Sequence, residues 1–379
     1  MPLEITESNG LWSATHAKGR CGGPRTVACK DSLVSDFSCS IDSVPDYLIH
    51  SKNARVYHKA GQSIFEGEGA YPTGQTIRQI SRYAANAMRV TWDINWPKAT
   101  APKDAVQIGN ATLNGKWRRV MVLERDGKAT WQELAPGQNL TWQENPPLAL
   151  VFEREDGAQV EFSYGFDLWR WNFGLGLTNS IPLKVTVGEE SIQILRQVSD
   201  LSVAPSEKEE APTPQAREYR FMATLAWATP DMAPYTLRAR IHERNAVPVS
   251  FDDNGLLLNG LPEGARDFSI DLATLPFTCM ESDALLSRMK RFIRQLAAFS
   301  AEGSVVFSGF SPTCCTEASH CAKRAATLHW DHQALLTFAA WAKNCLGEGW
   351  SLDFQFPAPL ADLPSLKYIS LPNGFIYNE

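Results

Sequence analysis

The sequence lacks a basic charge balance and lacks long apolar runs. Lys and Arg number 36 against 42 Asp and Glu, which gives a formal net charge of −6. A nucleic-acid-binding chain usually presents a basic face, so we expect no nucleic-acid partner. No apolar run approaches the roughly 18 residues that a membrane-spanning helix needs, so we expect no membrane partner either.

Targeting signals and cysteines are also sparse. The segment Met1 to Glu7 lacks the basic and apolar regions of a signal peptide. We therefore expect a cytoplasmic protein, or a periplasmic or secreted one if a leader has been removed. The 8 cysteines show no disulfide-framework spacing, and we expect reduced thiols.

Several catalytic motifs are missing. There is no Walker loop, no complete dinucleotide fingerprint (Gly174-Leu175-Gly176 has no third glycine), no HExxH and no GxSxG. Their absence argues against the common nucleotide-dependent, zinc-protease and esterase classes. We expect no cofactor.

What the sequence does contain is a strong two-residue alternation. From Ala87 to Trp96, apolar residues take one side of the alternation and polar residues take the other. Successive side chains of a strand point to opposite faces, so this pattern is typical of a half-buried strand. The pattern recurs over most of the first 250 residues. We predict a mainly β protein built on a large antiparallel β-sandwich.

Turn signals connect the predicted strands. Asn114-Gly115 predicts a hairpin between strands at 105–113 and 117–123, and Asp156-Gly157 predicts another. The segment 203–216 is rich in Pro and Glu, and we interpret it as an exposed loop or a domain linker. Strand alternation resumes from Tyr219 to Trp227.

The period changes after about residue 265. Apolar residues from Leu285 to Phe299 and from Leu335 to Leu346 recur at helical spacing, and short strands lie before, between and after them. Such crossovers favour a parallel sheet. We predict a sandwich domain over residues 1–275 and an α/β segment over residues 276–379 that packs on it.

Long strands rich in Trp, Tyr and Arg give the chain a family resemblance. The residues that carry this resemblance are 79–96, 116–123, 148–171 and 219–227. In this texture the chain resembles the galactose-mutarotase-like superfamily. The resemblance implies a β-supersandwich that binds carbohydrate on the concave face of its larger sheet. In the epimerases of that superfamily, His residues and a late carboxylate perform catalysis.

Strand-borne polar and aromatic residues form the main candidate site. Carboxylates, arginines and indole rings suit sugar hydroxyls and ring faces, and two carboxylates at the right separation suit glycoside cleavage. The acid/base candidates are Asp93, Glu161, Asp167 and His58, and the binding candidates are Arg82, Trp92, Trp169 and Arg170. The alternative is a solvated sheet face with salt bridges between strands.

Two further groups have a functional and a structural interpretation. His58 could meet Glu66 or Glu68 across a hairpin as an acid/base pair, or it could be a hydrogen-bonded strand residue. The segment from Cys314 to His332 could bind zinc or supply a thiol nucleophile. Adjacent cysteines chelate one metal poorly, so we favour thiols that pack a loop and expect no metal.

The sequence therefore favours a carbohydrate-binding or carbohydrate-processing protein. If it is an enzyme, glycoside hydrolysis or epimerisation by acid/base chemistry is the expected reaction. The alternative is a non-catalytic structural or interaction protein. Whether the chain is an enzyme, and whether it forms a homo-oligomer, both stay open at this point.

Overall fold

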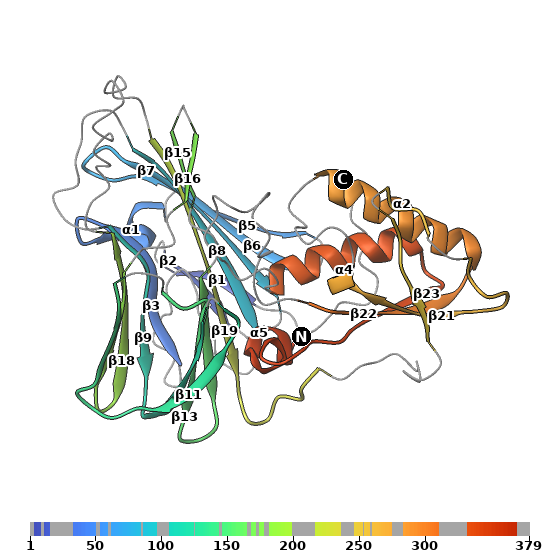
Figure 1. Ribbon diagram of the computed structural model, residues 1–379. Helices are drawn as coiled ribbons and strands as arrows, with labels where there is room; N and C mark the ends of the chain where they lie inside the picture. Colours follow the sequence, from blue (N-terminus) through green and yellow to red (C-terminus); the bar gives the residue numbers. More distant parts are fainter. Residues whose placement is uncertain are drawn as a thin grey trace, which may run out of the picture. The chain divides into compact units, whose positions relative to one another are not determined.

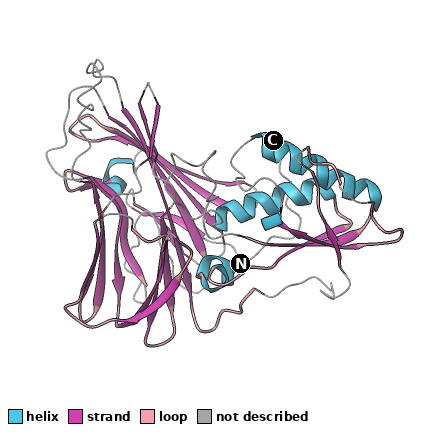
Figure 2. Cartoon of the chain, viewed as in Figure 1, coloured by secondary structure: helices cyan, strands magenta, loops and turns pink. Residues whose placement is uncertain are grey.

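The architecture comes from a computed structural model of the chain (Figures 1 and 2). It describes residues 4–8, 11–15, 33–50, 54–59, 62–84, 86–96, 106–124, 126–143, 146–164, 168–171, 174–177, 182–198, 217–235, 246–252, 254–257, 260–274, 283–310 and 332–369. These residues divide into two compact units, one ending at Met232 and the other beginning at Ala233.

The first unit contains an 11-stranded antiparallel sheet. Its strands are β5 (Ala54–Lys59), β6 (Gln62–Ala70), β7 (Thr76–Ala84), β8 (Ala87–Trp96), β10 (Trp117–Leu123), β11 (Ala129–Glu133), β13 (Ala149–Arg154), β14 (Gln159–Tyr164), β15 (Leu168–Trp171), β16 (Gly174–Leu177) and β19 (Arg217–Ala228). The main path runs β11-β10-β13-β14-β19-β8-β7-β6-β5, and β15 pairs with β19 and β16.

A second, 6-stranded antiparallel sheet completes the sandwich. Its order is β12-β17-β18-β9-β3-β4, where the strands are β3 (Val34–Ile41), β4 (Val44–Pro45), β9 (Val106–Asn114), β12 (Asn139–Trp142), β17 (Leu183–Val187) and β18 (Ser191–Val198). Strands β1 (Glu4–Ser8) and β2 (Leu11–Thr15) form a separate pair.

The hydrophobic core lies between these two sheets. Phe37 on β3 contacts Trp92 on β8, with ring centroids 5.7 Å apart, and Phe162 on β14, at 6.0 Å. The apolar side of the alternation in β8, from Met88 to Ile94, is buried there. The predicted β-sandwich is therefore confirmed, and so is the predicted burial of one side of β8.

The predicted hairpin at Asn114-Gly115 is wrong. Strand β9 pairs with β3 and β18, whereas β10 pairs with β11 and β13 in the other sheet. The turn therefore crosses from one sheet to the other, which a glycine at φ +99° allows at Gly115. The second predicted hairpin, at Asp156-Gly157, joins β13 to β14 as expected.

A short helix, α1 (Asp46–His50), lies against the core side of β6. A side chain at Gly69 would place its Cβ 2.4 Å from the Ile49 carbonyl oxygen, so this strand needs a glycine there. Asp46, the first residue of α1, is buried, and its Oδ2 accepts a hydrogen bond of 2.7 Å from the Trp92 indole. This helix was not predicted from the sequence.

The second unit is a parallel sheet with helices, as predicted. Strands β20 (Val247–Val249), β21 (Asp267–Asp271), β22 (Gly303–Ser308) and β23 (Trp350–Phe354) pair in that order. The helical segments are η2 (Leu272–Thr274), α2 (Asp283–Phe299), α4 (His332–Leu346), η3 (Leu360–Asp362) and α5 (Pro364–Lys367). The division between the units precedes the border predicted at residue 275, because β20 and β21 pair with strands of this sheet.

The two long helices cover one side of the parallel sheet, as Figure 1 shows. Phe307 on β22 meets Phe338 on α4 edge-on, with centroids 4.9 Å apart. Met289, Phe292, Ile293 and Leu296 of α2 are fully buried, whereas Phe299 at the end of the helix is 39% exposed. Among the described residues no helix is long and apolar enough to cross a membrane.

Candidate functional site

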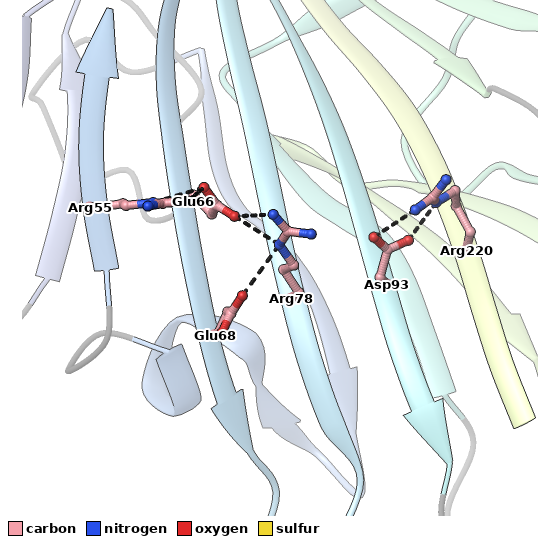
Figure 3. A network of polar contacts seen from close by, with 6 residues as sticks. All are labelled: Arg55, Glu66, Glu68, Arg78, Asp93 and Arg220. Atoms are coloured by element: carbon pink, nitrogen blue, oxygen red, sulfur yellow. Dashed lines mark hydrogen bonds and ion pairs between the residues drawn. The ribbon is translucent and has the colours of Figure 1, made fainter. Parts of the chain in front are cut away.

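Five neighbouring strands, β5 to β8 and β19, present a polar face on the side away from the core. Because side chains alternate and no bulge interrupts these pairings, each strand has one core side and one outer side. We call the outer side of these five strands the charged face. It carries the ion pairs in Figure 3.

Glu66 on β6 is the buried centre of the charged face. Its carboxylate is 4% exposed and accepts hydrogen bonds from both flanking strands. The Arg55 guanidinium donates to Oε2 from Nε at 2.9 Å and from Nη2 at 2.5 Å. Arg78 donates to Oε1, from Nε at 2.8 Å and also from Nη2. Each carboxylate oxygen thus accepts two hydrogen bonds from one arginine.

A row of alternating charges continues from Arg78 across the sheet. Glu68, Arg78, Asp93 and Arg220 stand directly opposite one another on β6, β7, β8 and β19. Arg78 Nε lies 3.3 Å from Glu68, and Arg220 donates to Asp93 at 2.5 and 2.9 Å. Opposite charges on facing strands attract, so the row holds four strands in register.

Electrostatics keep Glu66 ionised. Burial alone would raise its pKa, but the hydrogen bonds from Arg78 and Arg55 outweigh burial and leave the pKa below its usual value. The same bonds raise the pKa of Arg55 and of Arg78. A general acid needs the opposite shift. Glu66 therefore serves as a hydrogen-bond acceptor that orients two arginines.

An exposed aromatic ring lies at the edge of the charged face. Tyr57 on β5 is 37% exposed, and the Arg55 guanidinium sits 5.5 Å from its ring centroid. The ring is on the same side of β5 as Arg55, two residues along the strand. Donors, acceptors and an aromatic surface are therefore within one patch.

The structure brings two of the predicted site residues to the charged face and separates a third from them. Asp93 and Arg82 both belong to this face. Glu161 is on the same side of the sheet, but its partner Ala226 is six residues from Arg220, the partner of Asp93, along β19. That spacing is about 20 Å. Glycosidase carboxylates stand roughly 5 to 9.5 Å apart, so Asp93 and Glu161 do not form such a pair.

Trp92 belongs to the core and not to the charged face. It is fully buried between the sheets and uses its indole nitrogen for Asp46. The prediction that it binds a sugar ring is not supported, because Trp92 occupies the apolar side of the β8 alternation. Glu161 is also fully buried, and it accepts a hydrogen bond from Ser163.

The predicted meeting of His58 with Glu66 or Glu68 does not occur. His58 pairs with Ser63 on the core side of β5, where Ser63 Oγ lies 3.0 Å from Nδ1. Glu66 and Glu68 are on the other side of the sheet. His58 thus behaves as the hydrogen-bonded strand residue that was the structural alternative.

Other predicted residues fall outside what the structure describes. Asp167 and the segment 314–331 lie outside the described residues, as does the loop at 203–216. Trp169 and Arg170 are on β15, with only their backbone described. His332, at the start of α4, is buried. Within the described ranges, no three His, Cys, Asp or Glu side chains form a group that could hold a metal ion.

A second charged group occurs on β10, β11, β13 and β14. Glu153 accepts hydrogen bonds of 3.0 Å from Arg119 and Gln159, and one from Arg118. The Arg119 guanidinium also lies 4.3 Å from the ring centroid of exposed Trp131. These bonds outweigh burial and lower the pKa of Glu153. Like the charged face, this group combines a carboxylate, arginines and an exposed aromatic ring.

Sequence reasoning missed Arg55, Arg78 and Arg220. The available signal was their position on the polar side of each alternation, the side that includes Arg82 and Asp93. What the sequence does not contain is the pairing of β8 with β19, which joins residues more than a hundred positions apart.

No protein-family model matches the sequence, and no curated protein matches it. Among solved structures, it is similar to an α-N-acetylgalactosaminidase from Bifidobacterium bifidum, with a TM-score of 0.32, 7% identity, and 85% of this chain and 54% of that chain covered. A galactose mutarotase-related enzyme from Lactobacillus acidophilus has a TM-score of 0.25 and 9% identity over 47% of this chain and 73% of that chain. A heparan sulfate lyase from Pedobacter heparinus has a TM-score of 0.24 and 8% identity over 55% of this chain and 27% of that chain.

These neighbours are carbohydrate-active enzymes by name, and the similarity is at low identity. One of them is a mutarotase-related enzyme. The chain spans about half the length of the glycosidase and about a quarter of the lyase.

Proposed function

We propose that this chain binds carbohydrate on the charged face. The observation that supports the proposal is the exposed ring of Tyr57 beside arginines and carboxylates already fixed in place by one another. Sugar hydroxyls both donate and accept hydrogen bonds, and guanidinium and carboxylate groups supply both partners. Side chains that are ordered before binding lose less entropy when the ligand arrives.

Each group has a distinct role in this proposal. Arg55 and Arg78 keep N–H groups at the surface while Glu66 fixes their planes. Asp93, which Arg220 positions, accepts hydrogen bonds from sugar hydroxyls. The Tyr57 ring stacks on the apolar face of a sugar ring. Binding accounts for these features better than acid/base cleavage, because the described carboxylates of this face are paired with arginines.

A glycan-binding measurement tests the proposal. We expect the wild-type protein to bind one class of oligosaccharide in a calorimetric screen, and Tyr57→Ala to weaken that binding about tenfold or more. Tyr57→Phe keeps the ring and should keep most of the affinity. The matched control is Trp131→Ala, which removes an exposed ring outside the charged face.

The rival function is a non-catalytic protein interaction through the sheet. It predicts no binding to any saccharide in the screen and equal behaviour of the wild type and Tyr57→Ala. That result would reject the carbohydrate proposal.

A further inference from the structure

The group around Glu153 lies at the opposite edge of the large sheet from the charged face. Strand β11, which carries Trp131, and strand β5, which carries Tyr57, are the two ends of the main strand path. The register leads from Trp131 through β10, β13, β14 and β19 to Ala87 on β8. Trp131 is therefore on the same side of the sheet as Asp93. We call this set of residues the edge group: Trp131, Arg118, Arg119, Glu153 and Gln159.

The polar side chains of the edge group hold one another in place. Arg119 binds Glu153 in a bidentate pair, with Nε 3.0 Å from Oε1 and Nη2 3.0 Å from Oε2. Gln159 donates to Oε2 at 3.0 Å, and Arg118 donates to Oε1. Bidentate pairs between arginine and carboxylate are strong and fix the geometry of both partners. Because Arg118 and Arg119 stay partly exposed, ordered N–H groups are present at the surface before any ligand arrives.

Trp131 adds an aromatic surface beside these donors. Its side chain is 39% exposed, although the Arg119 guanidinium lies 4.3 Å from its ring centroid. A cation against an indole ring is attracted to the ring and restricts its orientation. The exposed part of a ring held in this way is an apolar surface on which a sugar ring can stack.

The charges around Trp131 cancel. Glu133, the register partner of Arg119 on β11, places a second carboxylate next to that arginine. Arg118 and Arg119 are thus matched by Glu133 and Glu153. A balanced set gives no net attraction to an acidic or a basic molecule, and it offers both donors and acceptors.

We propose that the edge group, with Glu133, is a second carbohydrate site that takes a neutral saccharide. It shares the ligand class of the proposed function but not its residues. Trp131 stacks on the sugar ring, the arginines donate to its hydroxyls, and Glu133 accepts from them. Trp131 and Glu133 are two residues apart on β11, about 7 Å, so a single sugar stacked on the indole reaches this carboxylate.

Buried residues separate the edge group from the charged face. Eight strand spacings, about 38 Å along the sheet, lie between β11 and β5. On the outer side between them, the structure buries Met121, Val151, Glu161 and Ala226 completely. A sugar ring at one site therefore does not contact the other site, and one chain can bind two saccharides at once.

Titration calorimetry with hexasaccharides tests the second site. The neutral probes are cellohexaose, maltohexaose, xylohexaose, laminarihexaose and chitohexaose, and the acidic probe is hexagalacturonate. We expect at least one neutral probe whose binding Trp131→Ala weakens about tenfold or more and Tyr57→Ala leaves unchanged. Where one probe occupies both sites, the wild type should bind two molecules and each variant one. Trp131→Ala then changes the number of sites but not the affinity of the charged face, for which it remains the control.

Two further measurements place the ligand at Trp131. Phe299→Ala is the matched control, because it removes an equally exposed ring, at 39%, from the end of α2. It should leave the binding of every probe unchanged. Trp131→Phe keeps a ring and should retain most of the affinity. In hydroxyl-radical footprinting, the bound probe should protect the peptide that contains Trp131.

The outcomes separate the second site from the function proposed above. If the binding of no probe depends on Trp131, the second site is rejected, and binding that depends on Tyr57 leaves the charged face standing. Binding that depends on Trp131 alone would support the second site and reject the charged face. No binding to any probe would reject both. If hexagalacturonate binds at Trp131 more tightly than every neutral probe, the neutral ligand is wrong.

Discussion

Glu66 stabilises the charged face because two arginines donate hydrogen bonds to its buried carboxylate. Replacing it with Gln keeps the volume but removes the charge-assisted hydrogen bonds, which are worth about 1.5 to 3 kcal/mol each. We expect Glu66→Gln to lower the free energy of unfolding by about 2 to 4 kcal/mol in urea denaturation. Glu68→Gln is the matched control, because Glu68 is 63% exposed and should cost no more than about 0.5 kcal/mol. If the two variants lost the same free energy of unfolding, the burial of Glu66 would not make its ion pairs stronger than that of exposed Glu68.

The acid sensitivity of the fold should depend on the same residue. Because folding lowers the pKa of Glu66, its contribution is present above the unfolded pKa of about 4.3 and is lost as the pH falls through the folded pKa. Urea unfolding of the wild type at several pH values should show stability declining over that range. The decline should be shallower in Glu66→Gln. Parallel curves for the two proteins would contradict the lowered pKa.

Trp92 should affect stability rather than ligand binding. Trp92→Phe keeps an aromatic ring but removes the hydrogen bond to buried Asp46 and leaves part of the indole volume empty. We expect a loss of about 2 to 4 kcal/mol in unfolding free energy, with saccharide affinity unchanged. Trp131→Phe, at a 39% exposed position, should change stability by less than about 0.5 kcal/mol. A stable Trp92→Phe protein that loses binding would restore Trp92 as a ligand contact.

Among the elements, α1 requires glycine on the strand beneath it. Gly69→Ala would bring a Cβ to 2.4 Å from the Ile49 carbonyl oxygen, so α1 or β6 must shift. We expect a loss of about 2 kcal/mol or more in unfolding free energy. Gly260→Ala is the control, because nothing lies within 4 Å of its added Cβ. If both variants behaved alike, the close contact of α1 with β6 would not matter.

The alternation in the sequence predicts most strands and their buried sides, but not their partners. Met88 to Ile94 and Phe221 to Trp227 show their core sides clearly. The pairing of Asp93 with Arg220 depends on β19 joining β8, and nothing local specifies that contact. The Asn114-Gly115 error has the same origin, because a tight turn can join two sheets as well as two paired strands. His58 does not meet Glu66 because the two side chains lie on opposite sides of the sheet, and their spacing in the sequence does not show this without the strand register.

At the scale of the whole molecule, the sandwich should be most resistant to opening at its centre. Strands β8 and β19 lie in the middle of the large sheet, while β5 and β11 are its edges along the main path. Amide hydrogens open with free energies that rise toward the core. In hydrogen-exchange mass spectrometry we expect β8 and β19 to exchange slowest within the first unit and β5 and β11 fastest. Slow exchange at β11 or β5 would point to cover on those edges.

The row of charges from Glu68 to Arg220 also restricts the register in which these strands can pair. A slip of one residue between strands would expose the apolar side of β8, so hydrophobic burial already rejects it. A slip of two residues keeps the apolar side buried, so hydrophobic burial does not disfavour it. It would, however, set Asp93 opposite Glu218 or Met222 and Arg78 opposite Thr91 or Asn95, and the ion pairs would be lost. The ion pairs therefore disfavour register shifts of two residues, which hydrophobic burial alone would tolerate.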